Sequence, residues 1–229
     1  MLVSLSCFFL IIGVILMALY FILIHYSNSL IEDRTVKNHI RNSFAYQYYM
    51  NCSMGLRLFL YIVLGLSCVM MGLGITFFIS MMKATPYLVF IAVLFPLSFL
   101  FLYFSNILSL NYYKLHLISS IGGFFFFSAA CILSGIGPFI SKVGVELTYF
   151  SKPVMVAVGV VGAIAFLALI NPKLTNWAKM EKAEENGKTI YVKPKVNFYA
   201  LYEWVYLILL AVVSLLFFIN IIVQNLLTF

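Results

Sequence analysis

The chain has 229 residues, of which 64% are hydrophobic and 9% are charged, and its net charge is +7. A soluble domain usually has about a quarter of its residues charged. This composition, with a mean hydropathy of +1.09, therefore excludes a water-soluble globular protein. The basic residues are not interleaved with aromatic residues on a polar surface, so we expect no nucleic-acid partner. The composition predicts an all-α integral membrane protein, with the lipid bilayer as its first partner.

Six apolar segments are long enough to cross the hydrocarbon layer, which is roughly 30 Å thick, as helices that rise about 1.5 Å per residue. The first segment lacks the basic start and the cleavage site of a signal peptide, so we expect it to remain as a helix. We therefore expect a single domain, residues 1–229, built as a bundle of about six transmembrane helices. The expected spans are 2–24, 58–82, 87–103, 117–140, 153–170 and 198–223.

The first connection, residues 25–57, is polar and contains a helical pattern. Basic residues from Arg34 to Arg41 recur at helical spacing, beside an apolar stripe that runs from Val36 to Phe44. This pattern is typical of a helix that lies in the headgroup layer. It fits a solvated connector equally well.

Proline and small residues indicate how the spans pack. Pro96 lies inside the third span and predicts a kink there. Gly65 and Gly72 share one face of the second span, and small residues are also frequent in the fourth and fifth spans. Small residues let helix backbones approach closely, so we expect these three spans in the bundle interior or at a subunit contact. We expect the four phenylalanines at 124–127 to face lipid or a partner.

The last connection, residues 171–197, is the most hydrophilic part of the chain, with six lysines and three glutamates. Asn186 and Gly187 form a turn signal that precedes the β-prone sequence Thr-Ile-Tyr-Val. This stretch has room for a short helix and a β-hairpin, but not for an independent domain.

Lysine and arginine predict the orientation of the bundle. Eleven of the fourteen lie in the connections 25–57, 104–116 and 171–197. We therefore expect these three connections in the cytoplasm and both the N-terminus and the C-terminus outside it. The short loops and the absence of a transit signal favour a bacterial plasma (inner) membrane.

Six polar residues at the ends of spans should then lie at one depth, near the cytoplasmic face. Glu203 is the only carboxylate within an expected span, and ionisable groups inside a membrane are costly and often functional. If the six side chains converge, they form a polar ligand site. If they point outward, they are ordinary interfacial ends of helices. The six are His25, Arg57, Asn106, His116, Asn171 and Glu203.

Sequence motifs give no support for catalysis or for a bound cofactor. The chain has no HExxH, Walker A, GxGxxG or GxSxG motif, so we expect no catalytic residues and no metal ligands. Its four cysteines include no CxxC pair. We expect no cofactor, although His25 and His116 on different helices leave a haem with two histidine ligands as an alternative.

Three functions fit these observations. The first is a small permease or channel-like transport protein, acting alone or as a homo-oligomer, with an unidentified substrate. The second is a non-catalytic subunit that joins other membrane subunits in a secretion, transport or respiratory assembly. The third is a membrane enzyme acting on lipid or quinone, with His116 and Glu203 as its acid–base pair. An enzyme is the least favoured of the three.

Overall fold

The computed structural model describes residues 2–30, 40, 43–50, 52–82, 86–109, 112–140, 151–171, 181–185, 188–192 and 196–227. Within these residues the chain forms α-helices and one two-stranded sheet. The elements are α1 (Leu2–Ser29), α2 (Ala45–Met50), α3 (Met54–Ser80), α4 (Pro86–Ile107), α5 (Tyr113–Ile140), α6 (Lys152–Leu169), β1 (Glu181–Glu185), β2 (Lys188–Val192) and α7 (Phe198–Leu227).

Six helices in the described part of the chain, α1 and α3 to α7, are long and apolar enough to cross a membrane. This confirms the prediction of an all-α polytopic membrane protein. The helices extend past some of the predicted spans: α1 continues to Ser29 and α3 begins at Met54. The apolar run measures only the hydrocarbon layer, whereas the helix continues into the polar layer beside it.

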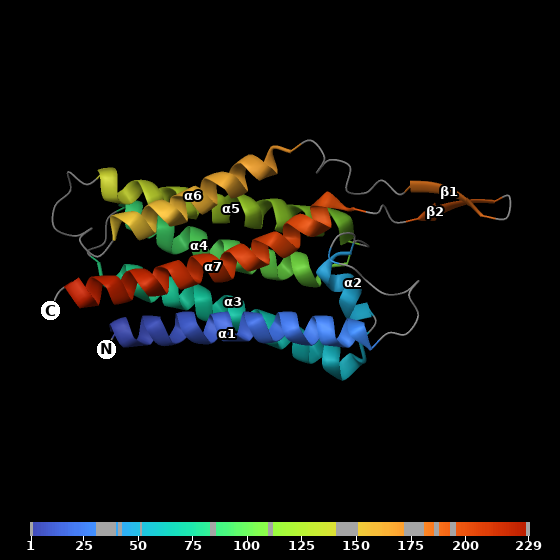
Figure 1. Ribbon diagram of the computed structural model, residues 1–229, viewed down its shortest axis with the longest axis horizontal. Coiled ribbons are helices and arrows are strands. Elements are labelled where there is room, and N and C mark those ends of the chain that lie inside the picture. Colours follow the sequence, from blue (N-terminus) through green and yellow to red (C-terminus); the bar gives the residue numbers. More distant parts are fainter. Residues whose placement is uncertain are drawn as a thin grey trace.

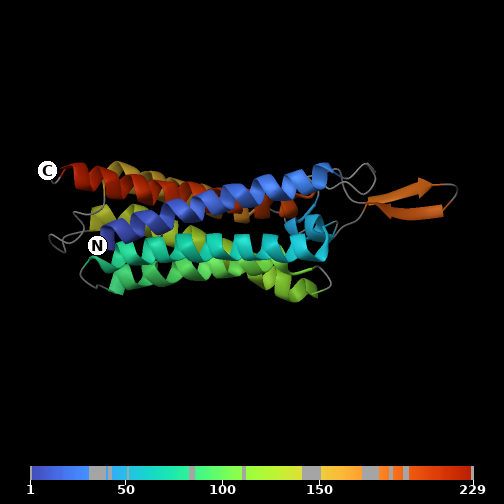
Figure 2. The same ribbon diagram turned by 90° about the horizontal axis from the view of Figure 1, so that it is seen from below.

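The six long helices lie side by side along the long axis of the molecule (Figures 1 and 2). Each packs against the next in the chain, and α7 packs against both α6 and α1, which closes the ring. The two termini lie at one end of the bundle (Figure 1). The opposite end, where α2 and the β strands lie, is called here the hairpin end. The assignment of this end to the cytoplasm remains a prediction.

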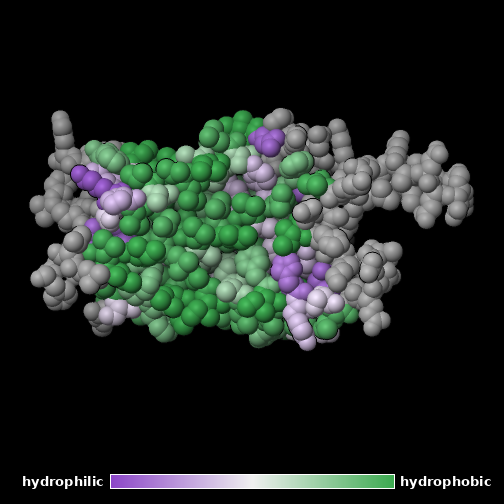
Figure 3. Space-filling model, viewed as in Figure 1, coloured by the Kyte–Doolittle hydropathy of each residue, from purple (hydrophilic) through white to green (hydrophobic). Residues whose placement is uncertain are grey.

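The outer surface of the bundle is apolar along most of its length. Figure 3 shows a broad hydrophobic band, with hydrophilic residues gathered near both ends. Large side chains such as Phe90 and Ile118 are more than half exposed, at 64% and 61%. Such a surface is stable in contact with lipid, as the composition predicts.

Close contacts between helix backbones occur at glycines of α3, α5 and α6, although not at the predicted Gly65 and Gly72, where an added Cβ would first meet ring atoms at 3.2 Å and 3.4 Å. A Cβ added to Gly135 of α5 would lie 2.5 Å from the Cα of Gly159 in α6. Gly74 of α3 packs in the same way against Leu10 of α1, where Ser6 Oγ donates a hydrogen bond to the Gly74 carbonyl at 2.7 Å. These contacts allow close van der Waals packing between helices, on which helix association depends because lipid provides no hydrophobic driving force for it.

The expectation that residues 124–127 all face lipid or a partner is wrong for two of the four. Phe124 and Phe127 are fully buried, whereas Phe125 is 51% exposed. Four consecutive residues cover the whole circumference of a helix, so positions three apart share one face. That face packs on Tyr206 of α7, with ring centroids 4.0 Å and 5.5 Å from Phe124 and Phe127.

The predicted β-hairpin is present. β1 and β2 pair antiparallel, from Glu181 opposite Val192 to Glu185 opposite Lys188. The predicted turn residues, Asn186 and Gly187, lie outside the described residues, as does most of the stretch before β1 that has room for a short helix. Figure 1 shows the strands projecting beyond the helices. Most of the predicted headgroup helix lies outside the described residues, but Phe44 at its end is only 2% exposed and packs into the bundle.

Candidate functional site

His116 and Glu203 form a buried ion pair between α5 and α7. The His116 Nε2 atom lies 2.9 Å from Glu203 Oε1, and neither side chain is more than 1% exposed. Ser120 lies one helical turn after His116 and donates a hydrogen bond from its Oγ to the same oxygen at 2.6 Å. Two side chains of α5 therefore hold one carboxylate oxygen of α7.

The start of α7 is fixed by a side-chain cap. The Asn197 Oδ1 atom accepts hydrogen bonds from the backbone N–H groups of Tyr199 and Ala200, at 3.1 Å and 3.2 Å. An asparagine in this position satisfies N–H groups that have no partner within the helix. The cap sets where α7 begins, and it thereby places Glu203 between one and two turns inside the bundle.

The contacts of the two ring nitrogens of His116 indicate which of them carries a hydrogen. His116 Nδ1 lies 2.9 Å from the carbonyl oxygen of Leu108. A carbonyl only accepts, so Nδ1 carries a hydrogen. Nε2 faces the carboxylate at ion-pair distance, but off the straight line of a well-aligned hydrogen bond. One proton between Nε2 and Oε1 makes this contact attractive, whether it resides on the imidazole or on the carboxyl group.

Glu203 Oε2 and Asn106 Oδ1 are buried oxygens near this end of the bundle that have no hydrogen-bond partner among the described residues. The amide nitrogen of Asn106 donates to the Leu102 carbonyl at 2.7 Å and lies 3.3 Å from Ser105 Oγ, so only its oxygen is unused. A buried acceptor without a partner costs about 1–3 kcal/mol. Both oxygens are available to a hydrogen-bond donor that enters the site.

Aromatic rings surround His116 on the side of the hairpin end. The ring centroids of Phe44, Tyr46 and Tyr199 lie 5.3, 6.0 and 6.3 Å from the imidazole. The three rings exclude water, and this strengthens the electrostatic interaction between His116 and Glu203.

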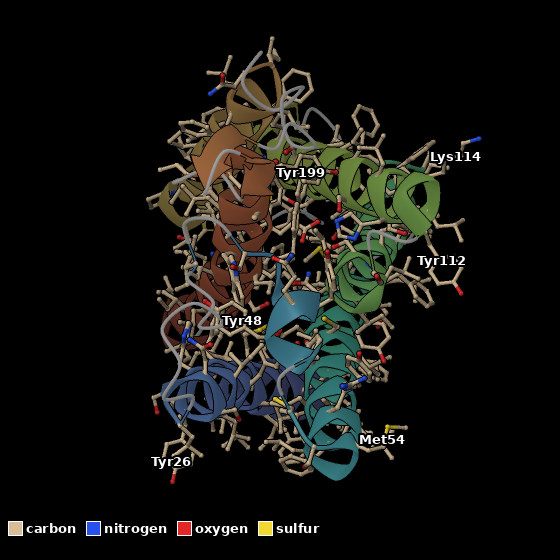
Figure 4. All side chains as sticks on the ribbon, turned by 90° about the vertical axis from the view of Figure 1, so that its right-hand side faces the viewer. Tyr26, Tyr48, Met54, Tyr112, Lys114 and Tyr199 are labelled. Carbon is tan, nitrogen blue, oxygen red and sulfur yellow. The ribbon has the colours of Figure 1, made fainter. Side chains whose placement is uncertain are left out.

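Residues 43–50, which include α2, cover the pair at the hairpin end and are called the α2 plug. Gln47 Oε1 accepts a hydrogen bond from Phe44 N at 3.0 Å, which caps the first turn of α2. In Figure 4, which looks onto this end, α2 lies across the middle of the bundle. The plug therefore separates the pair from the hairpin end.

Three hydrogen bonds tie the α2 plug to three different long helices. Trp204 Nε1 of α7 donates to the Ser43 carbonyl at 2.9 Å, and Arg57 Nε of α3 donates to the Tyr49 carbonyl at 3.0 Å. The Tyr49 hydroxyl lies 2.7 Å from the hydroxyl of Tyr20 on α1. Burial raises the pKa of Tyr49, so this hydroxyl stays neutral.

The structure brings together some of the six predicted site residues and separates others. His116 and Glu203 are in contact, and Asn106 is buried near the end of α4. His25 packs on Trp204 and Tyr48. The other two lie elsewhere at this end, because Arg57 holds the α2 plug and Asn171 follows the end of α6. Ligand binding by these residues remains a prediction.

Several residues of the site were not predicted from the sequence. Ser120 lies four residues after His116, and this spacing places it on the same face of a helix, so the sequence did contain its signal. Trp204 follows Glu203 directly. The α2 plug had no comparable signal, because its contacts join segments that are far apart in the chain.

Metal and haem binding were considered at the same site. Among the described residues, no group of three or more His, Cys, Asp or Glu side chains could hold a metal ion. Both nitrogens of His116 already face oxygen atoms, and His25 packs against Trp204. Ligation of one iron by both histidines therefore requires the His116–Glu203 pair to separate.

A groove of about 510 Å³ lies between α3 and α4, apart from the pair. It opens at the lipid-facing surface, where Val69 and Leu100 are 55% and 47% exposed. Its floor is the predicted small-residue face of α3. The lining residues are Gly65, Cys68, Val69, Gly72, Leu73, Thr76, Pro96, Phe99, Leu100 and Tyr103.

Comparison with known proteins gives no relative. No protein family, no curated protein and no solved structure matches the chain. Its architecture alone therefore classifies the chain, as a polytopic membrane protein with six helices that can cross the bilayer.

Proposed function

We propose that the chain is a small membrane permease in which the His116–Glu203 pair belongs to the solute or coupling-ion site. The observation that carries this proposal is the burial of Glu203, the only carboxylate in the helices that the structure describes. An ionisable residue inside a membrane bundle is costly, and such residues commonly belong to ion pathways and proton relays.

Further polar groups lie along the interior of α7 beyond this pair. Tyr206, Ser214 and Asn220 are all buried. The Tyr206 hydroxyl donates to the Ala165 carbonyl of α6 at 3.0 Å and lies 3.3 Å from Ser128 Oγ of α5. These groups lie between the pair and the end where the termini lie. They support a solute route along α7, closed here by apolar side chains such as Phe217 and at the hairpin end by the α2 plug.

Solute uptake into proteoliposomes tests the permease. The purified chain is reconstituted into phosphatidylethanolamine and phosphatidylglycerol vesicles, and uptake of labelled inorganic cations, amines, amino acids and sugars is measured. We expect at least one solute to enter, and E203Q to slow its uptake about tenfold or more, as loss of one charge-assisted interaction implies. E184Q makes the same change in β1, outside the bundle, and serves as the matched control. Uptake that is equal in the wild type and E203Q contradicts the proposal.

The second candidate is a subunit of a larger membrane assembly. The observation that favours it is the hairpin of β1 and β2, which projects beyond the helices and carries Lys182 and Lys188 (Figure 1). Purification from the native membrane in mild detergent, followed by mass spectrometry, tests this function. A stoichiometric partner that is lost when residues 181–192 are replaced by a glycine–serine linker supports the subunit. A chain that purifies alone supports the permease.

A further inference from the structure

We infer that the ligand of this site is a proton shared by His116 and Glu203, and that its loss releases the α2 plug. This inference deepens the proposed function, on which the transport role of the proton rests. The proton switch itself depends only on the contacts of His116, Glu203 and the plug.

The contacts of His116 allow one proton to be gained or lost. Nδ1 keeps its hydrogen, because it donates to the Leu108 carbonyl. With a proton between Nε2 and Oε1, the 2.9 Å contact is attractive. When that proton leaves to water, a neutral imidazole with a lone pair on Nε2 faces a carboxylate oxygen. Two acceptors at this distance repel each other in a buried site, so the unprotonated pair must separate.

The donors already aimed at Glu203 favour a proton over a metal cation. Oε1 accepts the hydroxyl hydrogen of Ser120 at 2.6 Å and faces Nε2 of His116 at 2.9 Å. A metal cation at this oxygen would lie beside these positively polarised hydrogens instead of oxygen lone pairs that could coordinate it. Hard cations such as Mg²⁺ and Ca²⁺ bind where several oxygen atoms converge.

The other ionisable groups around the pair come from each neighbouring helix. Tyr199 of α7, Tyr46 of α2 and Tyr20 of α1 are tyrosines, which ordinarily titrate near pH 10. α4 has two buried polar side chains near the hairpin end, Ser105 and Asn106, which do not titrate, and α6 has its one ionisable residue, Lys152, at the far end. Arg57 of α3 donates to the Tyr49 carbonyl of the plug, and Lys114 of α5 is exposed.

Among the described residues near the pair, His25 is the one other histidine, a side chain that ordinarily changes charge near neutral pH. It lies beside Trp204, with ring centroids 5.9 Å apart. Between about pH 5 and pH 8, the described residues near the site whose type ordinarily titrates are therefore the histidines, His25 and His116. An experiment on the pair must remove the contribution of His25.

Both members of the pair are connected to the α2 plug. Phe44 and Tyr46 of the plug pack on the His116 ring. Trp204 follows Glu203 on α7 and donates a hydrogen bond to the Ser43 carbonyl of the plug. Separation of α5 from α7 at the pair therefore displaces the plug at both contacts. A protonated site is closed at the hairpin end, and a deprotonated site is opened there.

Fluorescence of Trp204 measures this movement directly. The chain has two tryptophans, so W177F leaves Trp204 as the single emitter, and H25F keeps an aromatic ring in place while removing the titration of His25. In the detergent-purified W177F/H25F chain, we expect the Trp204 emission to move to longer wavelength in one transition as the pH rises from 5 to 9. E203Q in this background should abolish the transition. A flat emission, or an equal transition in E203Q, overturns the inference.

S120A provides a second test if E203Q does not fold, which its elution profile and melting curve reveal. The Ser120 hydroxyl stabilises the carboxylate most when the neighbouring proton has left, because the negative charge is then uncompensated. Its removal destabilises the deprotonated state more than the protonated state. The transition in S120A should therefore move to higher pH, by roughly half a unit to one unit. A transition at unchanged or lower pH contradicts the assignment.

Flux measurements separate this inference from the proposed function. Vesicles that contain the wild-type chain and a pH-sensitive dye are given a potassium gradient with valinomycin, with and without each solute. A pH transition of Trp204 in a chain that moves neither solute nor proton leaves the proton switch standing and removes the permease. Glu203-dependent solute uptake without any pH transition leaves the permease standing and removes the proton switch.

Discussion

His116, Ser120 and Glu203 act as one unit within the bundle. The carboxylate of Glu203 is fully buried, and the only described groups on its Oε1 atom are the Ser120 hydroxyl and the His116 ring. Removing one member of a buried ion pair leaves an uncompensated charge, whereas replacing both members by apolar residues is often neutral or stabilising. We therefore expect the intact pair to add little net stability to the fold compared with two apolar residues.

H116A should lower the free energy of unfolding by about 3–5 kcal/mol, because it leaves Glu203 buried without its partner. The double variant H116L/E203L should recover most of this loss. Unfolding in detergent, followed by circular dichroism, measures both values. S214A is the control, since the Ser214 hydroxyl only bonds back to the Leu210 carbonyl of its own helix. Equal losses in the single and the double variant contradict the description of the pair as an ionic unit.

Cys52 lies just before α3, and the reactivity of its thiol should depend on pH in a characteristic way. Burial raises the pKa of its thiol, while the hydrogen bond to Ser27 and the charge of Arg57 oppose this rise. The reactive thiolate therefore forms at higher pH than in a free cysteine. In a variant with Cys52 as its single cysteine, the rate of reaction with iodoacetamide should rise with pH, and the midpoint of this rise should lie at higher pH than for glutathione. R57Q should move the midpoint to still higher pH. A curve at or below that of glutathione contradicts this prediction.

At the scale of the helices, α5 and α6 pack through glycine. Gly135 and Gly159 face each other so closely that a single Cβ on Gly135 would lie 2.5 Å from the opposing Cα. The opposing atom belongs to backbone and cannot rotate away. The same feature holds Gly162 against Cys131, where an added Cβ would lie 2.5 Å from the cysteine Cβ. The two helices therefore approach as closely as their backbones allow.

G135A should force α5 and α6 apart and lower the free energy of unfolding by about 1–3 kcal/mol, the usual cost of overpacking. G55A is a matched control in the first turn of α3, because an added Cβ there meets no atom within 4 Å. Unfolding of both variants in detergent provides the measurement. If G135A is as stable as G55A, the two helices do not pack as described.

The sequence predicted the helices well and their contacts only in part. Each span is continuous and apolar, so its length alone identifies it. His116 and Glu203 were placed at a common depth because each lies near the same end of its helix. Whether they touch depends on how α5 and α7 are rotated about their own axes. This rotation cannot be predicted when similar apolar residues surround the whole helix. The apolar stripe that ends at Phe44 predicts a headgroup helix or a solvated connector, because nothing in its neighbourhood indicates Trp204, which bonds the adjacent Ser43.

At the scale of the whole molecule, charge and architecture combine into a prediction of orientation. The even number of crossings places both termini at one end of the bundle (Figure 1). The strands β1 and β2 lie at the other end. The excess of lysine and arginine in the connections at the hairpin end predicts that this end lies in the cytoplasm.

Reporter fusions measure this orientation. Alkaline phosphatase fused after Phe229 should be active in a bacterial host, and green fluorescent protein fused there should be dark. Green fluorescent protein inserted between residues 186 and 187 should fluoresce, because we expect that connection in the cytoplasm. The reverse pattern at both positions would show that the bundle is inserted the other way round.

The closed ring of helices has a consequence for how the molecule is made. α7 follows the other five spans in the chain, yet it closes the ring between α6 and α1 and supplies Glu203 and Trp204. During synthesis the earlier helices enter the membrane before α7 exists. His116 therefore has no contact with Glu203, and the α2 plug has no contact with Trp204, until α7 has entered the membrane. Completion of the site thus coincides with completion of the bundle, so any chain interrupted before α7 lacks both.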